Sequence, residues 1–227
     1  MKIKQLRTRA VNLVFCAVLA LLAVSACLTP AANAQVAQRP YIQEIQPGLY
    51  VAGVPTNEFE YYAAPQTAGH QRQTNWCWAA CIQMVLNYHG VAVTQEQVVQ
   101  RIFNGAVPNE PGRNDQILAA LSGWAFSSNG RPVMLTSTAV AMSGSEIVAD
   151  LAMKWPIIVG VQMVPGKTGH AYVMTAVTYR VDKANQPIFQ SVVLRDPWPD
   201  NPSRIEVSWD KFTKTWMFMA RMRVTRY

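Results

Sequence analysis

The sequence predicts an α+β domain, in which a helical half packs on a mainly antiparallel sheet and leaves a cleft between the two layers. An apolar run without Pro or Gly, residues 78–89, has the length of a buried helix. Capping patterns precede three further apolar segments before Pro156. After Pro156, β-branched or alternating segments are separated by Pro, Gly, Asn and Asp, which is typical of strands and turns.

The first element in chain order is an export signal over residues 1–34, where basic residues precede the apolar run 11–24 and then several small residues. Two cleavage sites compete. The segment Val24-Ser-Ala-Cys27 resembles a bacterial lipobox, in which Cys27 would be lipidated, whereas Ala32-Asn-Ala34 resembles an ordinary signal-peptidase site. An uncleaved anchor is a third alternative, although the apolar run is short for a membrane span. We expect an exported protein, periplasmic or extracellular, whose contact with a membrane would be the lipid anchor at Cys27.

Outside this signal the charge is nearly balanced. The whole chain has a formal charge of +7, and four of its basic residues lie in the signal: Lys2, Lys4, Arg7 and Arg9. About 190 residues with a charge of about +3 remain, enough for one domain with a substantial core. No Lys/Arg cluster remains that would indicate a phosphate-binding surface, so nucleic acid is not an expected partner. We expect a monomer.

The remaining elements follow in order. Residues 35–69 are polar and rich in turn residues, and they predict an irregular lead-in to a domain over 70–227. Helices are expected at 78–89, 98–103, 117–121 and 147–154. Strands are expected at 157–163, 170–181, 188–195, 204–207 and 217–224. The expected walls of the cleft are the loops 105–113, 122–132 and 165–169, with Trp124 lining one side.

Cys77 is the first candidate functional residue, because it opens the apolar helix and Gln71 lies six residues upstream. A thiol at a helix N-terminus sits among free N–H groups that favour negative charge, so the reactive thiolate forms more readily there. We interpret Cys77 as a nucleophile and Gln71 as its oxyanion donor.

The second cysteine of the domain, Cys81, has a structural interpretation. It lies four residues after Cys77 on the same helix, a poor geometry for a disulfide, and we interpret it as a small buried hydrophobe. A metal site made by these cysteines and a histidine is disfavoured because the histidines do not follow at structural-zinc spacing. We therefore expect no metal and no cofactor.

A cysteine nucleophile needs a base, and the chain contains three histidines. His89 lies twelve residues along the helix, about 18 Å from Cys77 at 1.5 Å per residue, which is too far. His70 precedes Gln71 in a loop, and nothing in the sequence fixes its position. His170 begins a strand after a Gly-rich loop, so its ring would project from a rigid element. We expect His170 to be the base.

The base in turn needs an acceptor that orients it, and Asp196 ends the strand expected to pair with the His170 strand. A turn between 179 and 189 would make these strands a hairpin and bring His170 and Asp196 together. The alternative is that Asp196, which precedes Pro197, only forms a turn. Trp198 would cover the bond between Asp196 and His170, or else pack in the core.

A family resemblance rests on four features: Gln71, the segment W-C-W-A-A at 76–80, Gly169-His170, and Asp196-Pro-Trp198. Over roughly residues 70–200, the chain resembles papain-like cysteine proteases, and it resembles their bacterial secreted and effector branch more than papain itself. The resemblance implies Cys77 as nucleophile, His170 as general acid and base, Asp196 as orienting residue, and the Gln71 side chain with the Cys77 N–H as oxyanion hole.

The resemblance also implies acyl transfer through a covalent acyl-enzyme, and hence an exported cysteine peptidase acting on a protein or peptide substrate. Two alternatives stay open. One is a cell-wall amidase that cuts peptidoglycan stem peptides, and the other is an inactive papain-like protein that binds peptides in the same cleft.

Overall fold

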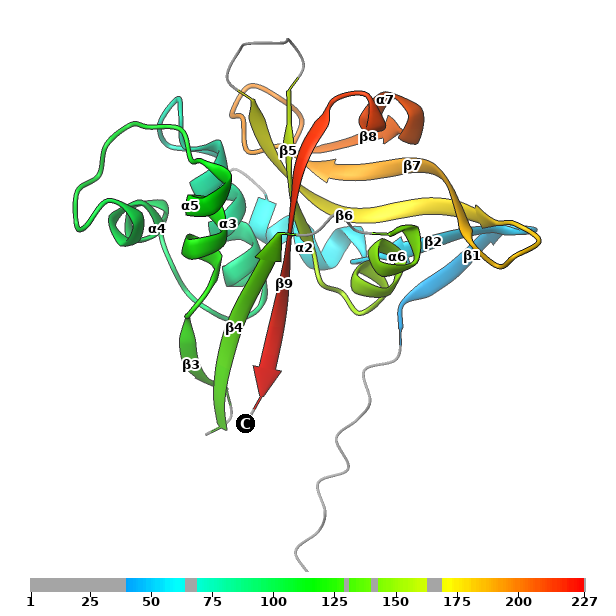
Figure 1. Cartoon of the computed structure of the whole chain (residues 1–227), viewed down its shortest axis with the longest axis horizontal. Coiled ribbons are helices and arrows are strands. Elements are labelled where there is room, and N and C mark those ends of the chain that lie inside the picture. Colours follow the sequence, from blue (N-terminus) through cyan, green and yellow to red (C-terminus); the bar gives the residue numbers. More distant parts are fainter. Residues whose placement is uncertain (1–39, 64–68, 129–130, 140–142, 163–168, 227) are drawn as a thin grey trace, which may run out of the picture. The chain divides into compact units, whose positions relative to one another are not determined.

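The computed structural model describes residues 40–226 except 64–68, 129–130, 140–142 and 163–168 (Figure 1). The described residues belong to one compact unit that begins at Arg39. The expected export signal at 1–34, with Cys27, lies outside the described residues, as does most of the loop 165–169. None of the described helices has the length and apolarity that crossing a bilayer requires.

Local sequence signals place the helices. Thr94 Oγ1 accepts a hydrogen bond from the Gln97 backbone, and the Gln97 side chain accepts one from the Thr94 backbone, which completes a capping box. Ser143 and Glu146 form a second box in the same way. The described helices are α2 Thr56–Ala63, α3 Cys77–Tyr88, α4 Gln95–Ile102, α5 Asn114–Leu121, α6 Gly144–Ala152 and α7 Trp209–Thr213. All four predicted helices are confirmed, and they correspond to α3, α4, α5 and α6.

The strands form a single sheet in which every pairing is antiparallel. The strands are β1 Ile42–Gln46, β2 Leu49–Gly53, β3 Ala125–Ser128, β4 Arg131–Ala139, β5 Ile157–Val161, β6 His170–Val181, β7 Pro187–Arg195, β8 Arg204–Ser208 and β9 Trp216–Arg226. All five predicted strands are confirmed, and they correspond to β5 through β9. The predicted α+β fold class is therefore confirmed.

The long strand β6 organises the sheet. One of its edges pairs with β5 near His170 and with β2 farther along, and its other edge pairs with β7. The sheet continues from β5 through β9 and β4 to β3, and from β7 to β8. In Figure 1, helices α3, α4 and α5 gather on one side, whereas the β6–β7 hairpin extends on the other.

The expectation of an irregular lead-in is wrong for residues 42–63, which form β1, β2 and α2. All five residues of β1 are exposed, so the strand has no buried face and no alternation that the sequence could show. A turn at Gly48, with φ of 69°, returns the chain into β2, which pairs with β6 more than a hundred residues later. Local composition does not reveal such a distant pairing.

The expected loop at 122–132 also differs, because it contributes to β3 and β4. Strand β4 is held by β9, again a distant partner. Trp124 donates its indole N–H to the Ala120 carbonyl at 2.6 Å and lies under the Arg101 guanidinium, 4.5 Å from ring centroid to Cζ. Trp124 is not among the described residues that line the cavity beside Cys77.

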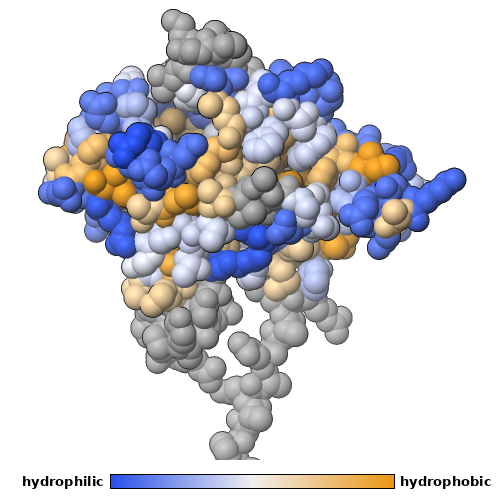
Figure 2. Space-filling model, viewed as in Figure 1, coloured by the Kyte–Doolittle hydropathy of each residue, from blue (hydrophilic) through white to orange (hydrophobic). Residues whose placement is uncertain are grey.

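Two apolar clusters cover the two faces of the sheet, because side chains alternate along its strands. Val173 packs in the cluster that contains the α3, α4 and α5 side chains, whereas Met174 packs in the cluster that contains the α6 and α7 side chains. Hydrophobic (orange) and hydrophilic (blue) residues are mixed on the outer surface seen in Figure 2. The sheet is thus the middle of a layered domain, and the site lies between the sheet and the α3 layer.

Candidate active site

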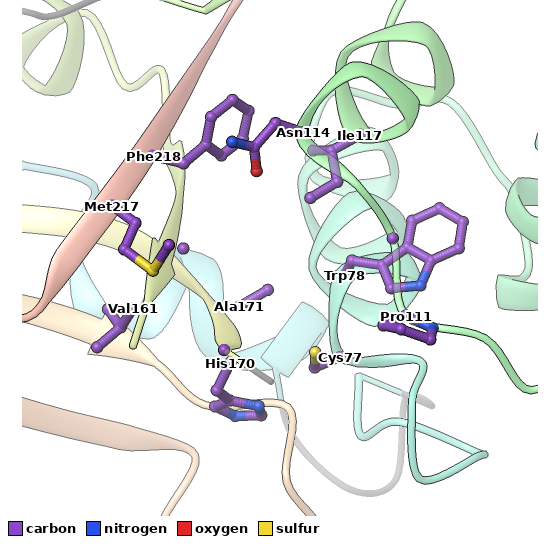
Figure 3. Close-up of a pocket in the computed structure, with 13 residues that line it drawn as sticks. Cys77, Trp78, Pro111, Asn114, Ile117, Val161, His170, Ala171, Met217 and Phe218 are labelled. Carbon is purple, nitrogen blue, oxygen red and sulfur yellow. The ribbon is translucent and has the colours of Figure 1, made fainter. Parts of the chain in front are cut away.

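Cys77 is the first residue of α3, and residues 78–86 behind it are all buried. No side chain caps this helix, so N–H groups of its first turn are available for a negative charge. Cys77 is half-buried, and it lines the same cavity as His170, whose pKa it helps to raise. Figure 3 shows the Cys77 sulfur and the His170 ring facing each other across the gap between helix and sheet.

His170 is the first residue of β6, and its ring is 23% exposed. Nε2 lies 2.8 Å from Asp196 Oδ1. Burial lowers the pKa of His170, but the hydrogen bonds and negative charges of Asp196 and Cys77 outweigh it and raise the pKa to about 9. The ring is therefore held as an imidazolium at neutral pH, the partner that a thiolate needs.

Asp196 follows the last residue of β7, and its side chain is only 2% exposed. Burial raises its pKa, but hydrogen bonds from His170, the Trp198 N–H and Asn201 overcome this effect and lower the pKa below its usual value. The carboxylate therefore stays ionised beside the imidazolium.

The register of the β6–β7 hairpin brings His170 and Asp196 together. Val173 is paired with Arg195, so the N-terminal end of β6 and the C-terminal end of β7 lie at the same end of the hairpin. The Trp198 ring lies 6.2 Å from the His170 ring, between centroids, and Tyr172 meets the same ring edge-on at 4.6 Å. Tyr172 is an aromatic neighbour that sequence reasoning missed, and its signal is the position two residues after His170 on the same strand face.

The structure places Gln71 in the loop that leads to Cys77, where it is buried. Its Nε2 donates to the carbonyls of Gln73 and Thr74, both at 3.0 Å, while its buried Oε1 has no hydrogen-bond partner in the described part of the chain. Its backbone N–H donates to the Pro197 carbonyl at 2.7 Å, which ties this loop to the Asp196 loop. The oxyanion role of Gln71 stays a prediction, and it requires one of the two side-chain bonds to be released.

The expected cleft between the layers contains a cavity of about 140 Å³ beside Cys77. Trp78 and Ile117 line it from the helical side, and Val161, Ala171 and Phe218 line it from the sheet (Figure 3). These side chains make the lining mostly apolar. The cavity lies where a side chain next to a bond under attack by Cys77 would be placed.

The two tryptophans of W-C-W hold one wall of this cleft. Trp76 donates its indole N–H to the Pro108 carbonyl at 2.9 Å, and Trp78 donates to the Glu110 carbonyl at 3.1 Å. A side chain at Gly112 would place its Cβ 2.5 Å from the Trp78 ring, so the close approach of this loop requires glycine. Both indoles thus fasten the loop 105–113 to the helix that carries the nucleophile.

A family comparison identifies the class of protein. The model of the Peptidase_C39 like family matches residues 56–223, a span that includes Cys77, His170 and Asp196. The chain belongs to the Peptidase_C39 like family. It is thus a cysteine-type peptidase. No curated protein sequence matches it significantly.

Two solved structures are similar to this C39-like peptidase. One is the peptidase domain of Streptococcus ComA, a bifunctional ABC transporter involved in a quorum-sensing pathway, with 15% identity over 69% of this chain and 95% of that chain and a TM-score of 0.46. The other is a double-glycine-motif protease from an AMS/PCAT transporter in complex with the leader peptide, with 13% identity over 83% of this chain and 94% of that chain and a TM-score of 0.43.

The structure also places the remaining candidate residues of the C39-like peptidase, His89, His70 and Cys81. His89 follows the last residue of α3, at the opposite end from Cys77. The backbone carbonyl of His70 accepts a hydrogen bond from the Gln95 side chain. Cys81 is fully buried, as predicted, and burial raises its pKa well above the usual value. No metal-binding group of His, Cys, Asp or Glu occurs among the described residues.

Proposed function

We propose that this C39-like peptidase is exported and hydrolyses peptide bonds through Cys77, His170 and Asp196. One observation carries the proposal: the His170 ring lies beside Cys77, which contributes to its raised pKa, and is held 2.8 Å from the buried Asp196 carboxylate. The ring lies at a cavity between two layers, in a chain that belongs to a peptidase family. A nucleophile, an acid–base group and an orienting group are the parts that acyl transfer needs.

In the first half of the reaction, the Cys77 thiolate attacks the carbonyl carbon and forms a tetrahedral adduct. Because Nε2 of His170 is engaged by Asp196, Nδ1 is the atom that faces the reaction and gives its proton to the leaving nitrogen. The C–N bond breaks, the amine leaves and a thioester remains. The Cys77 N–H at the start of α3 stabilises the oxyanion, with Gln71 Nε2 as a second donor once one of its carbonyl bonds is released.

In the second half, water attacks the thioester while neutral His170 takes its proton. The carboxylic acid product leaves, and the thiolate and imidazolium are restored. Asp196 keeps the ring in one orientation throughout and stabilises its positive charge.

The substrate we propose is a protein or peptide with an apolar side chain next to the scissile bond, because the cavity beside Cys77 is mostly apolar. The export signal expected at residues 1–34 supports a periplasmic or extracellular location, with a lipid anchor if Cys27 is modified. We further propose that the protein belongs to a secreted branch of such peptidases and acts as a monomer.

The test is digestion of a peptide mixture by the purified protein, with products identified by mass spectrometry. Cys77→Ala and His170→Ala should abolish cleavage while circular dichroism shows a retained fold. Full activity in Cys77→Ala protein would overturn the proposal. The pH dependence of Cys77 alkylation gives an independent reading, because a thiolate–imidazolium pair reacts fast well below the usual thiol pKa of about 8.5 and loses this advantage in His170→Ala protein.

Digestion of peptidoglycan beside the peptide mixture separates the two alternative functions. New fragments from peptidoglycan, without cleavage of other peptides, would indicate a cell-wall amidase. Peptide that binds without any release of product would indicate an inactive binding protein.

A further inference from the structure

The loop after β7 is built around the side chain of Asp196. The Trp198 N–H donates to Asp196 Oδ1 at 2.9 Å, and the Asn201 N–H donates to the Trp198 carbonyl at 3.2 Å. The Asp196 N–H donates to the Ser203 carbonyl at 3.1 Å, next to the paired residues of β7 and β8. The loop therefore leaves the sheet and returns to it within a few residues, and Asn201 is held at a defined place.

The two oxygens of the Asp196 carboxylate have different donors. Oδ1 accepts from His170 Nε2 at 2.8 Å and from the Trp198 N–H. Oδ2 accepts from Asn201 Nδ2 at 2.8 Å. A carboxylate torsion is broad, so donors on one oxygen alone leave the plane of the group weakly defined. The Asn201 bond defines the second oxygen, and with it the direction in which Oδ1 faces His170.

We propose that Asn201 is a positioning residue of the peptidase, whose amide fixes the Asp196 carboxylate and thereby the His170 ring. The inference rests on the proposed function of Cys77, His170 and Asp196. An amide suits the role because its NH₂ group donates to the anion without changing the net charge. Asn201 is otherwise exposed, so its contribution comes through this one contact rather than through core packing.

The titratable and charged groups near Asp196 determine how a pH profile is interpreted. Among the described residues, the titratable groups that interact with it are His170 across the hairpin, Cys81 from α3 and Tyr172 from β6. Asp200, in the same loop, is exposed. The Arg195 side chain instead contacts Glu60 and the Thr56 carbonyl of α2. Of the neutral side chains in the described part of the chain, Asn201 is the one that donates to Asp196 and lowers its pKa.

The experiment compares Asn201→Leu, which removes the donor, with Asn201→Asp, which places a carboxylate against Asp196. The control is Asn185→Asp, which adds the same charge in the β6–β7 turn, at the far end of a strand of twelve residues from His170 and about 35 Å away at 3.3 Å per residue. Asparagine and aspartate both tolerate the positive φ of 59° found there. Tm and circular dichroism confirm that each variant is folded.

Two quantities are measured against pH: kcat/KM for peptide cleavage and the rate of Cys77 alkylation by iodoacetamide. We expect Asn201→Leu to lower kcat/KM about 10- to 100-fold, the equivalent of one hydrogen bond to a charged group. Loss of the Asn201 donor should raise the pKa of Asp196, and a carboxylate at position 201 should raise it further. We therefore expect the acid limb of both profiles to move to higher pH in Asn201→Leu and farther in Asn201→Asp. It should stay unchanged in Asn185→Asp. Folded Asn201 variants with an unmoved acid limb would overturn the inference, whatever their activity.

Failure of the proposed function gives a different result. A wild-type protein that cleaves no peptide, but whose alkylation profile still moves in the Asn201 variants, would retain Asn201 as the residue that positions the pair and would remove only the peptidase assignment.

Discussion

Removal of the Glu60 carboxylate tests how the N-terminal elements support the site. Arg195, the residue before Asp196, is only 1% exposed, and its Nη1 lies 2.5 Å from Glu60 Oε2. Nη2 donates to the Thr56 carbonyl at 3.3 Å, and the guanidinium lies over the Phe59 ring. Burial lowers the pKa of Arg195, so the buried cation depends on its carboxylate partner. Glu60→Ala leaves that cation without its partner.

The expected magnitude follows from the exposure of the two partners. Removal of one partner from a fully buried pair costs about 3–5 kcal/mol. Glu60 is 45% exposed, so water enters in its place, and we expect a lower cost for Glu60→Ala of about 2 kcal/mol, within the range of one charged hydrogen bond. Glu60→Gln keeps an acceptor, and we expect it to cost about 1 kcal/mol. For a domain of this size, about 2 kcal/mol lowers Tm by roughly 4–8 °C.

The assay is urea and thermal unfolding of the wild-type and variant proteins. The matched control is Glu96→Ala, which breaks the pair between Glu96 and Arg72, whose side chains are 36% and 44% exposed. We expect this control to cost less than about 1 kcal/mol, because both of its partners are hydrated. If Glu60→Ala and Glu96→Ala destabilise the protein equally, burial of Arg195 does not set the cost and the reasoning fails.

Two further predictions concern the cleft. Asp196→Asn removes the bond and charge that help to raise the His170 pKa to about 9, so the alkaline limb of the kcat/KM profile, which reports loss of the His170 proton, should move to lower pH; an unmoved limb would contradict the electrostatic account. Gly160→Ala adds a methyl group beside Phe218, where its Cβ would have an ordinary 3.4 Å contact. It should lower the kcat/KM ratio of large over small apolar side chains about tenfold while Tm is kept, and equal loss for all peptides would count against the cavity as a subsite.

Linkage gives the pH dependence of folding the sign that these shifts require. The folded-state pKa of His170 is raised to about 9, so its stabilising contribution is complete below about 6.5 and is lost as the pH rises through 9. The folded-state pKa of Asp196 is lowered, so its contribution is present above the ordinary carboxyl pKa and is lost as the pH falls through the lowered value. The pair therefore stabilises the fold most at a pH above the ordinary carboxyl pKa and below about 6.5.

Sequence alone predicted the helices α3 to α6 and the strands β5 to β9, because each has its own local signal. The Thr94 and Ser143 capping boxes and the alternation after Pro156 need no knowledge of distant residues. The same local reasoning selected Cys77 at a helix start and His170 at a strand start, and it predicted the hairpin that places Asp196 beside His170.

Tertiary structure decided the features that depend on residues far apart in the chain. Strand β2 pairs with β6 and β4 pairs with β9, and β1 in turn pairs with β2, although the exposed residues of β1 carry no pattern that shows this. The bonds of the Gln71 amide to its own loop and of Asn201 to the second oxygen of Asp196 depend on how loops close, which local sequence preferences do not encode. Sequence therefore determined which residues supply the chemistry, and packing decided how they are held, because hydrogen bonds between loops form only once the sheet and the helices have met.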